Sequence, residues 1–310
     1  MFVEDKKFIM LFNYIKRRSL AITFLLTIAL FLLLMLILLN KTFYFAITQH
    51  FIGKDVRKNA IVTRDIKYCK TQNPSQEYDI FIPRHRPFGD APVVVNVHGG
   101  GWRWGNRING IEEHYAGEFT SRGIAFVSID YRLADEAVYP SQNEDVHCAL
   151  EHIRANEEKY NIDTRNIVIM GDSAGGHLAA MEALIPETKN EVDGVVMLYG
   201  VSDLWNQITN YKDINAIHYL GAKNEALAKQ ASPMYADLNN APPFLLIHGT
   251  SDSIVPASDS EKFTNKLKQN NNSAIFMPVN GAEHAFVGGN DYHEKQIHER
   301  LLNYVVNKLY

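Results

Sequence analysis

Six short apolar runs follow one another along the chain, and helical patterns separate most of them. Such nearly continuous runs are typical of strands that are buried on both faces of a sheet. They lie at 93–97, 124–129, 167–170, 194–199, 244–247 and 274–277. The helical patterns cover Ile111–Arg122, Asn143–Tyr160, His177–Leu184, Ser258–Gln269 and His293–Leu309. The alternation predicts an α/β domain whose mostly parallel central sheet carries helices on both faces.

Two further segments before these runs have the composition of strands. Ala60–Tyr68 and Tyr78–Pro83 are rich in β-branched and aromatic residues, and the turn residues Asn73, Pro74 and Ser75 separate them. We expect an antiparallel pair at one edge of the sheet. The longest irregular stretch, Val201–Leu238, is either the wall or lid of a pocket or an ordinary helical excursion, since loops after strands build the sites of open α/β sheets.

The N-terminal part has a different pattern, because residues 20–39 form an uncharged apolar run. Twenty residues at a rise of about 1.5 Å span roughly 30 Å, the thickness of a bilayer core. The run lacks a small-residue cleavage site, so we predict a single transmembrane signal anchor after a short tail, 1–19. A connector or cap segment, 40–59, and a catalytic domain, 60–310, follow. The basic cluster at 16–18 favours a cytoplasmic N-terminus and a catalytic domain on the non-cytoplasmic side.

Composition adds two constraints. The chain has 310 residues and a formal net charge of −4, so nothing indicates nucleic acid as a partner. Its two cysteines, Cys69 and Cys148, lack metal-type spacing. They could pair outside the cytoplasm, but a core of this size needs no disulfide, and we expect two unpaired thiols with Cys148 on the buried face of a helix.

One motif indicates the chemistry. Residues 171–175 read Gly-Asp-Ser-Ala-Gly and stand between an apolar strand and a helical pattern. Strand, sharp turn and helix are the setting in which the serine of G-x-S-x-G is exposed as a nucleophile. Ser173 is therefore the predicted nucleophile.

A serine nucleophile needs a base and a carboxylate that orients the base, in the chain order serine, acid, histidine. Asp252 follows the strand at 244–247, and His284 follows the last strand. We predict that Asp252 is the acid and His284 the base. Asp203 also follows a strand and is the alternative acid, although hydrogen bonding to nearby loop backbone is the better interpretation.

Donors for an oxyanion are predicted in the loop His98-Gly99-Gly100-Gly101, which follows the strand at 93–97. Glycine allows the backbone to approach a carbonyl oxygen closely. Gly100 and Gly101, together with the N–H of Ala174, are the predicted oxyanion hole. Trp102 either lines the alcohol side of the pocket or packs at the surface.

Taken together, these motifs resemble the hormone-sensitive-lipase-like branch of the α/β-hydrolase carboxylesterases. The resemblance rests on HGGGW at 98–102, DYRLA at 130–134, GDSAGGHLAA at 171–180, HGTSDSIVP at 248–256 and His284. An anchor in front of this domain also resembles arylacetamide deacetylase and its relatives. The resemblance implies the α/β-hydrolase fold, ester hydrolysis without a cofactor or metal, and the triad Ser173, Asp252 and His284.

We therefore expect a membrane-anchored serine carboxylesterase that acts on small-molecule or lipophilic esters. The same triad could serve an amidase or peptidase. A non-catalytic ligand-binding protein is the third possibility, but the relatives of that kind lose the histidine that stands here at 284.

Overall fold

The computed structural model describes residues 27–28, 58–69, 73–86, 89–108, 111–186 and 191–310. The chain divides into two units, Met1–Phe51 and Ile52–Tyr310, and the strands β1 to β8 belong to the second unit. Apart from two residues, the predicted anchor at 20–39 lies outside the described residues, and so does nearly all of the connector at 40–59. Over the described ranges, no helix combines the length and apolar character that crossing a membrane requires.

Eight strands form one sheet in the order β1-β2-β4-β3-β5-β6-β7-β8. β1 and β2 pair antiparallel, as do β2 and β4, and every other neighbouring pair is parallel. The predicted edge pair and the mostly parallel sheet are thereby confirmed. The strands are β1 (Ala60–Lys67), β2 (Glu77–Pro83), β3 (Ala91–Val97), β4 (Ala125–Ile129), β5 (Ile162–Asp172), β6 (Gly194–Leu198), β7 (Phe244–Gly249) and β8 (Ala274–Val279).

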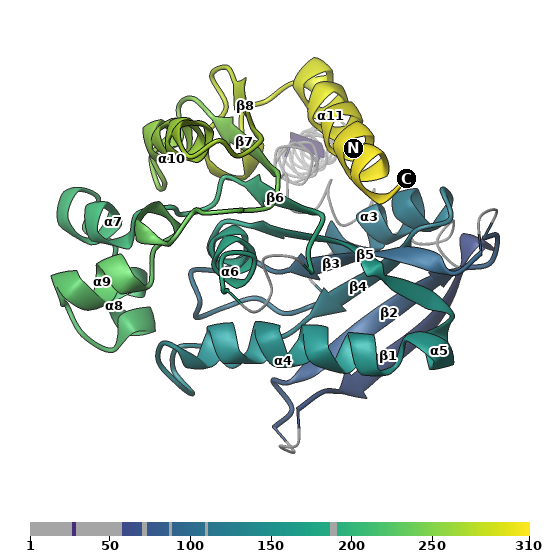
Figure 1. Cartoon of the computed structure of the whole chain (residues 1–310). Coiled ribbons are helices and arrows are strands. Elements are labelled where there is room, and N and C mark those ends of the chain that lie inside the picture. The colour runs from purple at the N-terminus through teal and green to yellow at the C-terminus, as the bar shows by residue number, and fades with distance from the viewer. Residues whose placement is uncertain (1–26, 29–57, 70–72, 87–88, 109–110, 187–190) are drawn as a thin grey trace, which may run out of the picture. The chain divides into compact units, whose positions relative to one another are not determined.

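Helices cover both faces of this sheet (Figure 1). α4 (Ser141–Ala155), α6 (Ala174–Glu182) and α10 (Ala257–Gln269) contribute to one apolar core, and α3 (Ile111–Thr120) and α11 (Asp291–Leu309) to the other. β3 shows why its sequence is a continuous apolar run. Val93 and Val95 belong to the first core, whereas Val94 belongs to the second.

The stretch between β6 and β7 is helical. It forms α7 (Leu204–Asn210), α8 (Ile214–Leu220), α9 (Glu225–Gln230) and the short 3-10 turn η1 (Pro233–Tyr235). The side chains of Asp203, Asp213 and Asn224 each accept a backbone N–H at the start of one of these helices. One predicted helix, Asn143–Tyr160, is divided near Asn156 into α4 and α5 (Glu157–Tyr160).

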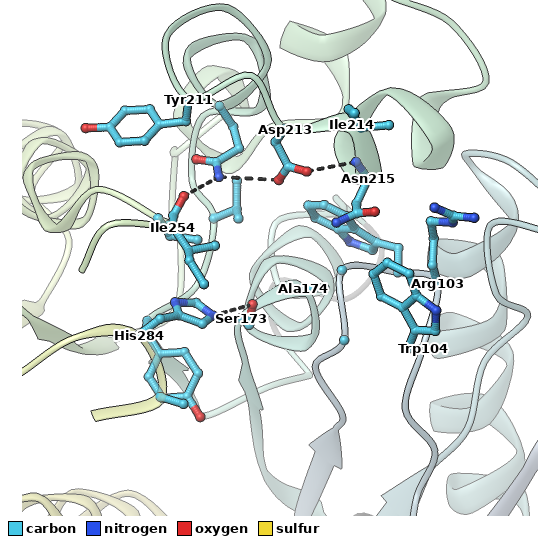
Figure 2. Close-up of a pocket in the computed structure, with 18 of the residues that line it drawn as sticks. Arg103, Trp104, Ser173, Ala174, Tyr211, Asp213, Ile214, Asn215, Ile254 and His284 are labelled. Atoms are coloured by element: carbon cyan, nitrogen blue, oxygen red, sulfur yellow. Dashed lines mark hydrogen bonds between the residues drawn. The ribbon is translucent and has the colours of Figure 1, made fainter. Parts of the chain in front are cut away.

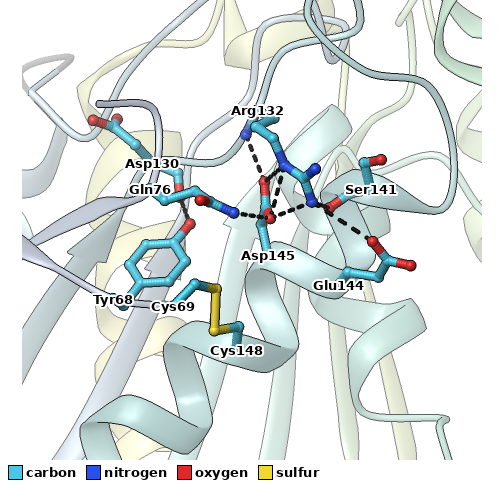
Figure 3. The surroundings of a disulfide bond; sticks show 9 residues. All are labelled: Tyr68, Cys69, Gln76, Asp130, Arg132, Ser141, Glu144, Asp145 and Cys148. Atoms are coloured by element: carbon cyan, nitrogen blue, oxygen red, sulfur yellow. Dashed lines mark hydrogen bonds and ion pairs between the residues drawn. A yellow bond between two sulfur atoms is a disulfide. The ribbon is translucent and has the colours of Figure 1, made fainter. Parts of the chain in front are cut away.

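The expectation of two unpaired thiols is wrong. Cys69, just after β1, forms a disulfide with Cys148 of α4, with Cα atoms 5.7 Å apart (Figure 3). Polar contacts to α4 lie beside the disulfide. The side chain of Gln76, directly before β2, donates to Asp145 of α4 at 2.6 Å, and Arg132, after β4, pairs with the same carboxylate at 2.7 Å. The two cysteines are 79 residues apart in sequence. They meet only because the chain after β1 packs near α4, which the sequence does not show.

Candidate active site

Ser173 stands on the sharp turn between β5 and α6. Its backbone has φ 50° and ψ −118°, a conformation that is strained for a residue with a side chain. The turn requires glycine on both sides. A Cβ on Gly171 would lie 2.4 Å from the backbone of Gly175, and a Cβ on Gly175 would lie 2.0 Å from the carbonyl oxygen of Val97. The motif therefore presents the serine hydroxyl at the carboxyl end of the sheet.

The structure brings the three predicted triad residues together. His284 Nε2 lies 3.0 Å from Ser173 Oγ, and His284 Nδ1 lies 2.7 Å from Asp252 Oδ2. Because a carboxylate can only accept, Nδ1 carries the proton and Nε2 is free to accept from the serine hydroxyl. Asp252 comes from the loop after β7, and His284 begins the 3-10 turn η2 (His284–Phe286) after β8.

The environment of Asp252 keeps its carboxylate charged. Burial alone raises the pKa of this group, but hydrogen bonds from His248, His284 and the backbone N–H of Val255 outweigh burial and hold the pKa well below its usual range. Asp203, the alternative acid, makes other contacts. Asp203 caps α7 by accepting the N–H of Asn206, and it also accepts the hydroxyl of Tyr235.

The glycine loop lines the cavity beside Ser173 and Ala174. Gly100 and Gly101 have φ values of +117° and +58°, which favour glycine. A Cβ on Gly100 would also lie 2.0 Å from the carbonyl oxygen of Trp104. The loop can therefore take this path only with glycine there, and the donation of its N–H groups to an oxyanion stays a prediction.

Trp102 is buried rather than at the surface, with 1% of its area exposed. Its Nε1–H donates to His177 Nδ1 at 3.2 Å, and its ring stacks on Tyr219 with centroids 4.8 Å apart. The residue belongs to the cavity lining but is anchored in the core below it. Trp104, in contrast, leaves 55% of its area exposed.

Asp172 belongs to the serine motif, and its contacts indicate a role that the motif alone does not predict. Its Oδ1 accepts the backbone N–H of Gly99 at 3.0 Å, which ties the glycine loop to the end of β5. Burial raises the pKa of Asp172 to about 6, although the Gly99 N–H and the nearby His284 act in the opposite direction. Recognising this contact requires knowing that β3 and β5 are neighbours, which a linear motif does not state.

A cavity of about 760 Å³ lies over the triad. Figure 2 shows Arg103 and Trp104 on one side of it, His284 and Ile254 on the other, and Tyr211 and Ile214 across the top. Four exposed apolar side chains lie among its lining residues, Trp104 (55%), Tyr211 (42%), Ile214 (64%) and Ile254 (55%), beside polar ones such as Lys212 and Asp213. The stretch between β6 and β7 is therefore both helical and a wall of the pocket.

The part of the chain that the structure describes contains no cluster of three or more His, Cys, Asp or Glu side chains that could hold a metal ion.

Comparisons with known proteins agree on an esterase-like chain. Residues 78–267 match the family model described as BD-FAE. The chain is 32% identical to Esterase LipC of Mycobacterium tuberculosis over 237 residues, which are 69% of this chain and 58% of that protein. It is 26% identical to isoprenylcysteine alpha-carbonyl methylesterase ICME of Arabidopsis thaliana, over 76% of this chain and 58% of that protein. The chain spans 50% to 58% of the length of the mycobacterial relatives LipC, LipM and LipQ.

Solved structures show a similar fold. A truncated carbohydrate esterase from gut microbiota superposes with a TM-score of 0.68 at 23% identity, over 80% of this chain and 97% of that one. A bacterial heroin esterase superposes with a TM-score of 0.66 at 24% identity, over 86% of this chain and 90% of that one.

Proposed function

This chain belongs to the BD-FAE family, and we propose that it is a serine carboxylesterase of the α/β-hydrolase fold. The observation that carries the proposal is the hydrogen-bonded chain from Ser173 through His284 to Asp252 beneath a cavity. The names of several relatives, which include esterases and a carboxylic ester hydrolase, support ester bonds as the target.

In the proposed reaction, Ser173 Oγ attacks the ester carbonyl carbon while His284 Nε2 takes the hydroxyl proton. Asp252 holds the imidazole in the required tautomer and stabilises its charged form. The N–H groups of Gly100, Gly101 and Ala174 would stabilise the oxyanion, and each such donor typically contributes roughly 3 to 4 kcal/mol to lowering the barrier. His284 then protonates the leaving alcohol, and water releases the acid by the same steps in reverse.

We further propose that the natural substrate carries an apolar group. The exposed lining residues Trp104, Ile214 and Ile254 would lose water-exposed apolar surface against such a group. The cavity is large enough for a small molecule of drug size, since ligand pockets are commonly about 300–1,000 Å³.

We also propose that the catalytic domain works outside the cytoplasm, held by the predicted anchor at 20–39. The Cys69–Cys148 disulfide supports this location, because disulfides persist in oxidising compartments. Fractionation of cells, followed by protease treatment of intact and opened cells, tests it. Digestion of the catalytic domain by a protease that reaches only the cytoplasm would contradict the location.

The test of the activity is hydrolysis of p-nitrophenyl acetate, butyrate, octanoate and palmitate by the full chain in detergent. We expect turnover that Ser173→Ala abolishes while the far-UV circular dichroism stays unchanged. Equal turnover by the folded Ser173→Ala protein would overturn the proposal. Labelling by an organophosphonate probe provides an independent readout of an activated serine.

A further inference from the structure

A second histidine contacts the carboxylate of the triad. His248 lies near the end of β7, four residues before Asp252, and its side chain is fully buried. Its Nε2 lies 3.1 Å from Asp252 Oδ2 and 3.0 Å from the carbonyl oxygen of Val255. The acid of the triad thus stands between two imidazoles.

The neighbours of His248 fix its tautomer. Both groups near Nε2 are acceptors, so Nε2 carries a proton. Nδ1 lies 2.8 Å from the hydroxyl of Ser260, a buried residue of α10 that can donate to it. Ser260 therefore orients His248 by donating to its Nδ1, whereas Asp252 orients His284 by accepting from its Nδ1.

Both carboxylate oxygens of Asp252 accept two hydrogen bonds each. Oδ2 accepts from His284 at 2.7 Å and from His248, whereas Oδ1 accepts the backbone N–H groups of Ile254 at 2.9 Å and Val255 at 2.8 Å. These four donors, which come from β7, from the loop after it and from η2, restrict rotation of the carboxylate. Without His248, the oxygen that meets His284 would lose one of its two donors.

We propose that His248 is a positioning residue of the triad, which holds Oδ2 of Asp252 toward His284 and takes up part of its negative charge. The proposal rests on the proposed esterase function, because it concerns the efficiency of the same triad. His248 touches neither the serine nor the cavity. Its effect on the reaction would therefore pass through Asp252.

This role predicts a change in pH dependence that a packing role does not. With one donor fewer, Asp252 would stabilise the charged form of His284 more strongly, and the acid limb of kcat/KM would move to higher pH. The other titratable groups around His284 are Asp172 from the end of β5 and Tyr199 from the end of β6, with Glu283 bonded to Ser253 beside it. None of them is altered by a change at position 248.

The experiment compares His248→Phe, which removes the donor but keeps an aromatic ring, with His248→Gln, which keeps an N–H donor. Hydrolysis of p-nitrophenyl butyrate is measured between about pH 5 and 9, together with thermal unfolding. For His248→Phe we expect kcat to fall about tenfold with KM unchanged, since misplaced triad groups slow the chemical step. The midpoint of the acid limb of kcat/KM should move to higher pH by about half a unit. His248→Gln should recover most of both changes.

Ser260→Ala keeps the imidazole and provides a milder test, which decides the matter if His248→Phe does not fold. We expect a smaller fall in kcat and a shift of the acid limb in the same direction. Thr264→Val is the matched control, because it removes another buried hydroxyl of α10 whose hydrogen bond goes to the Ser260 backbone. Its pH profile should equal that of the unaltered protein.

Folded variants whose acid limb does not move, with His248→Gln as slow as His248→Phe, would overturn the positioning role. The failure of the underlying function looks different. In that case the unaltered protein itself shows no hydrolysis that depends on Ser173.

Discussion

Two carboxylates stand close to His284 at the same end of the sheet, and their pKa values are shifted in opposite directions. Asp252, after β7, accepts from two histidines and two backbone N–H groups, and its pKa is held well below the usual range. Asp172, at the end of β5, accepts the N–H of Gly99, and burial raises its pKa to about 6.

The difference shows that burial alone does not set the charge of a carboxylate near Ser173 and His284. Both carboxylates are taken out of bulk water, and the number of donors that reach each one decides which effect is larger. Asp252 is thus suited to remain charged while His284 gains a proton. Asp172 is suited to hold the glycine loop, and it takes up a proton on the acid side of neutrality.

The largest effect is expected from Asp252→Asn, which removes the negative charge that distinguishes Asp252 from Asp172 at low pH. We expect kcat to fall by about 10⁴-fold, because the amide favours the wrong tautomer of His284 and does not stabilise its charged form. The fall in kcat is measured by steady-state ester hydrolysis, and circular dichroism checks that the variant is folded. A fall of less than tenfold would mean that another carboxylate, such as Asp203, orients the histidine.

The second prediction concerns stability and uses Asp172→Asn. The pKa of Asp172 is raised in the folded protein, so ionising it costs folding free energy. This cost is absent below the unfolded value of about 3.8 and complete above about pH 6. The variant should therefore be more stable at pH 8 by up to about 3 kcal/mol, with the difference vanishing near pH 4.

Denaturant unfolding at both pH values checks this prediction. Asp135→Asn is the control, since Asp135 is an exposed carboxylate paired with Arg103, and its replacement should leave the pH dependence almost unchanged. Equal stability of Asp172→Asn and the unaltered protein at pH 8 would show that burial does not act on this carboxylate as described.

The smallest effect is expected from Gly99→Ala, which disturbs the contact of Asp172 without changing its charge. The added Cβ would lie 2.3 Å from Asp172 Oδ2 and 2.8 Å from its carbonyl oxygen, so the loop must shift. We expect kcat to fall about tenfold as the neighbouring donors move away from the oxyanion. An unchanged kcat would mean that the contact between Gly99 and Asp172 does not determine the position of the glycine loop.

The sequence predicted the sheet well because its strands are buried on both faces and therefore read as apolar runs. The chain order of Ser173, Asp252 and His284 likewise follows from where each stands relative to a strand. Helices α7 to α9 were harder to predict, since six or seven residues are too few to show a helical period. Their signal was an Asp or Asn directly before each helix.

The roles of Asp172 and His248 could not be predicted from the motifs that contain them. The role of Asp172 depends on Gly99, which lies in the loop after the neighbouring strand β3 and is far away in sequence. The role of His248 depends on Ser260, which belongs to another element, α10. The pairing of the cysteines depends on tertiary structure in the same way. The anchor at 20–39 stays a prediction.

The disulfide also separates the proposed oxyanion-loop glycines from the proposed triad along the covalent chain. Bonding of Cys69 to Cys148 closes residues 69–148 into a ring, which contains Gly100 and Gly101. Ser173, Asp252 and His284 lie outside this ring. A protease cut within it, for example at the exposed Arg84, would leave one molecule, heavier only by the water added in hydrolysis, until a reductant opened the ring. A cut between Ser173 and His284 would separate two fragments at once under denaturing conditions.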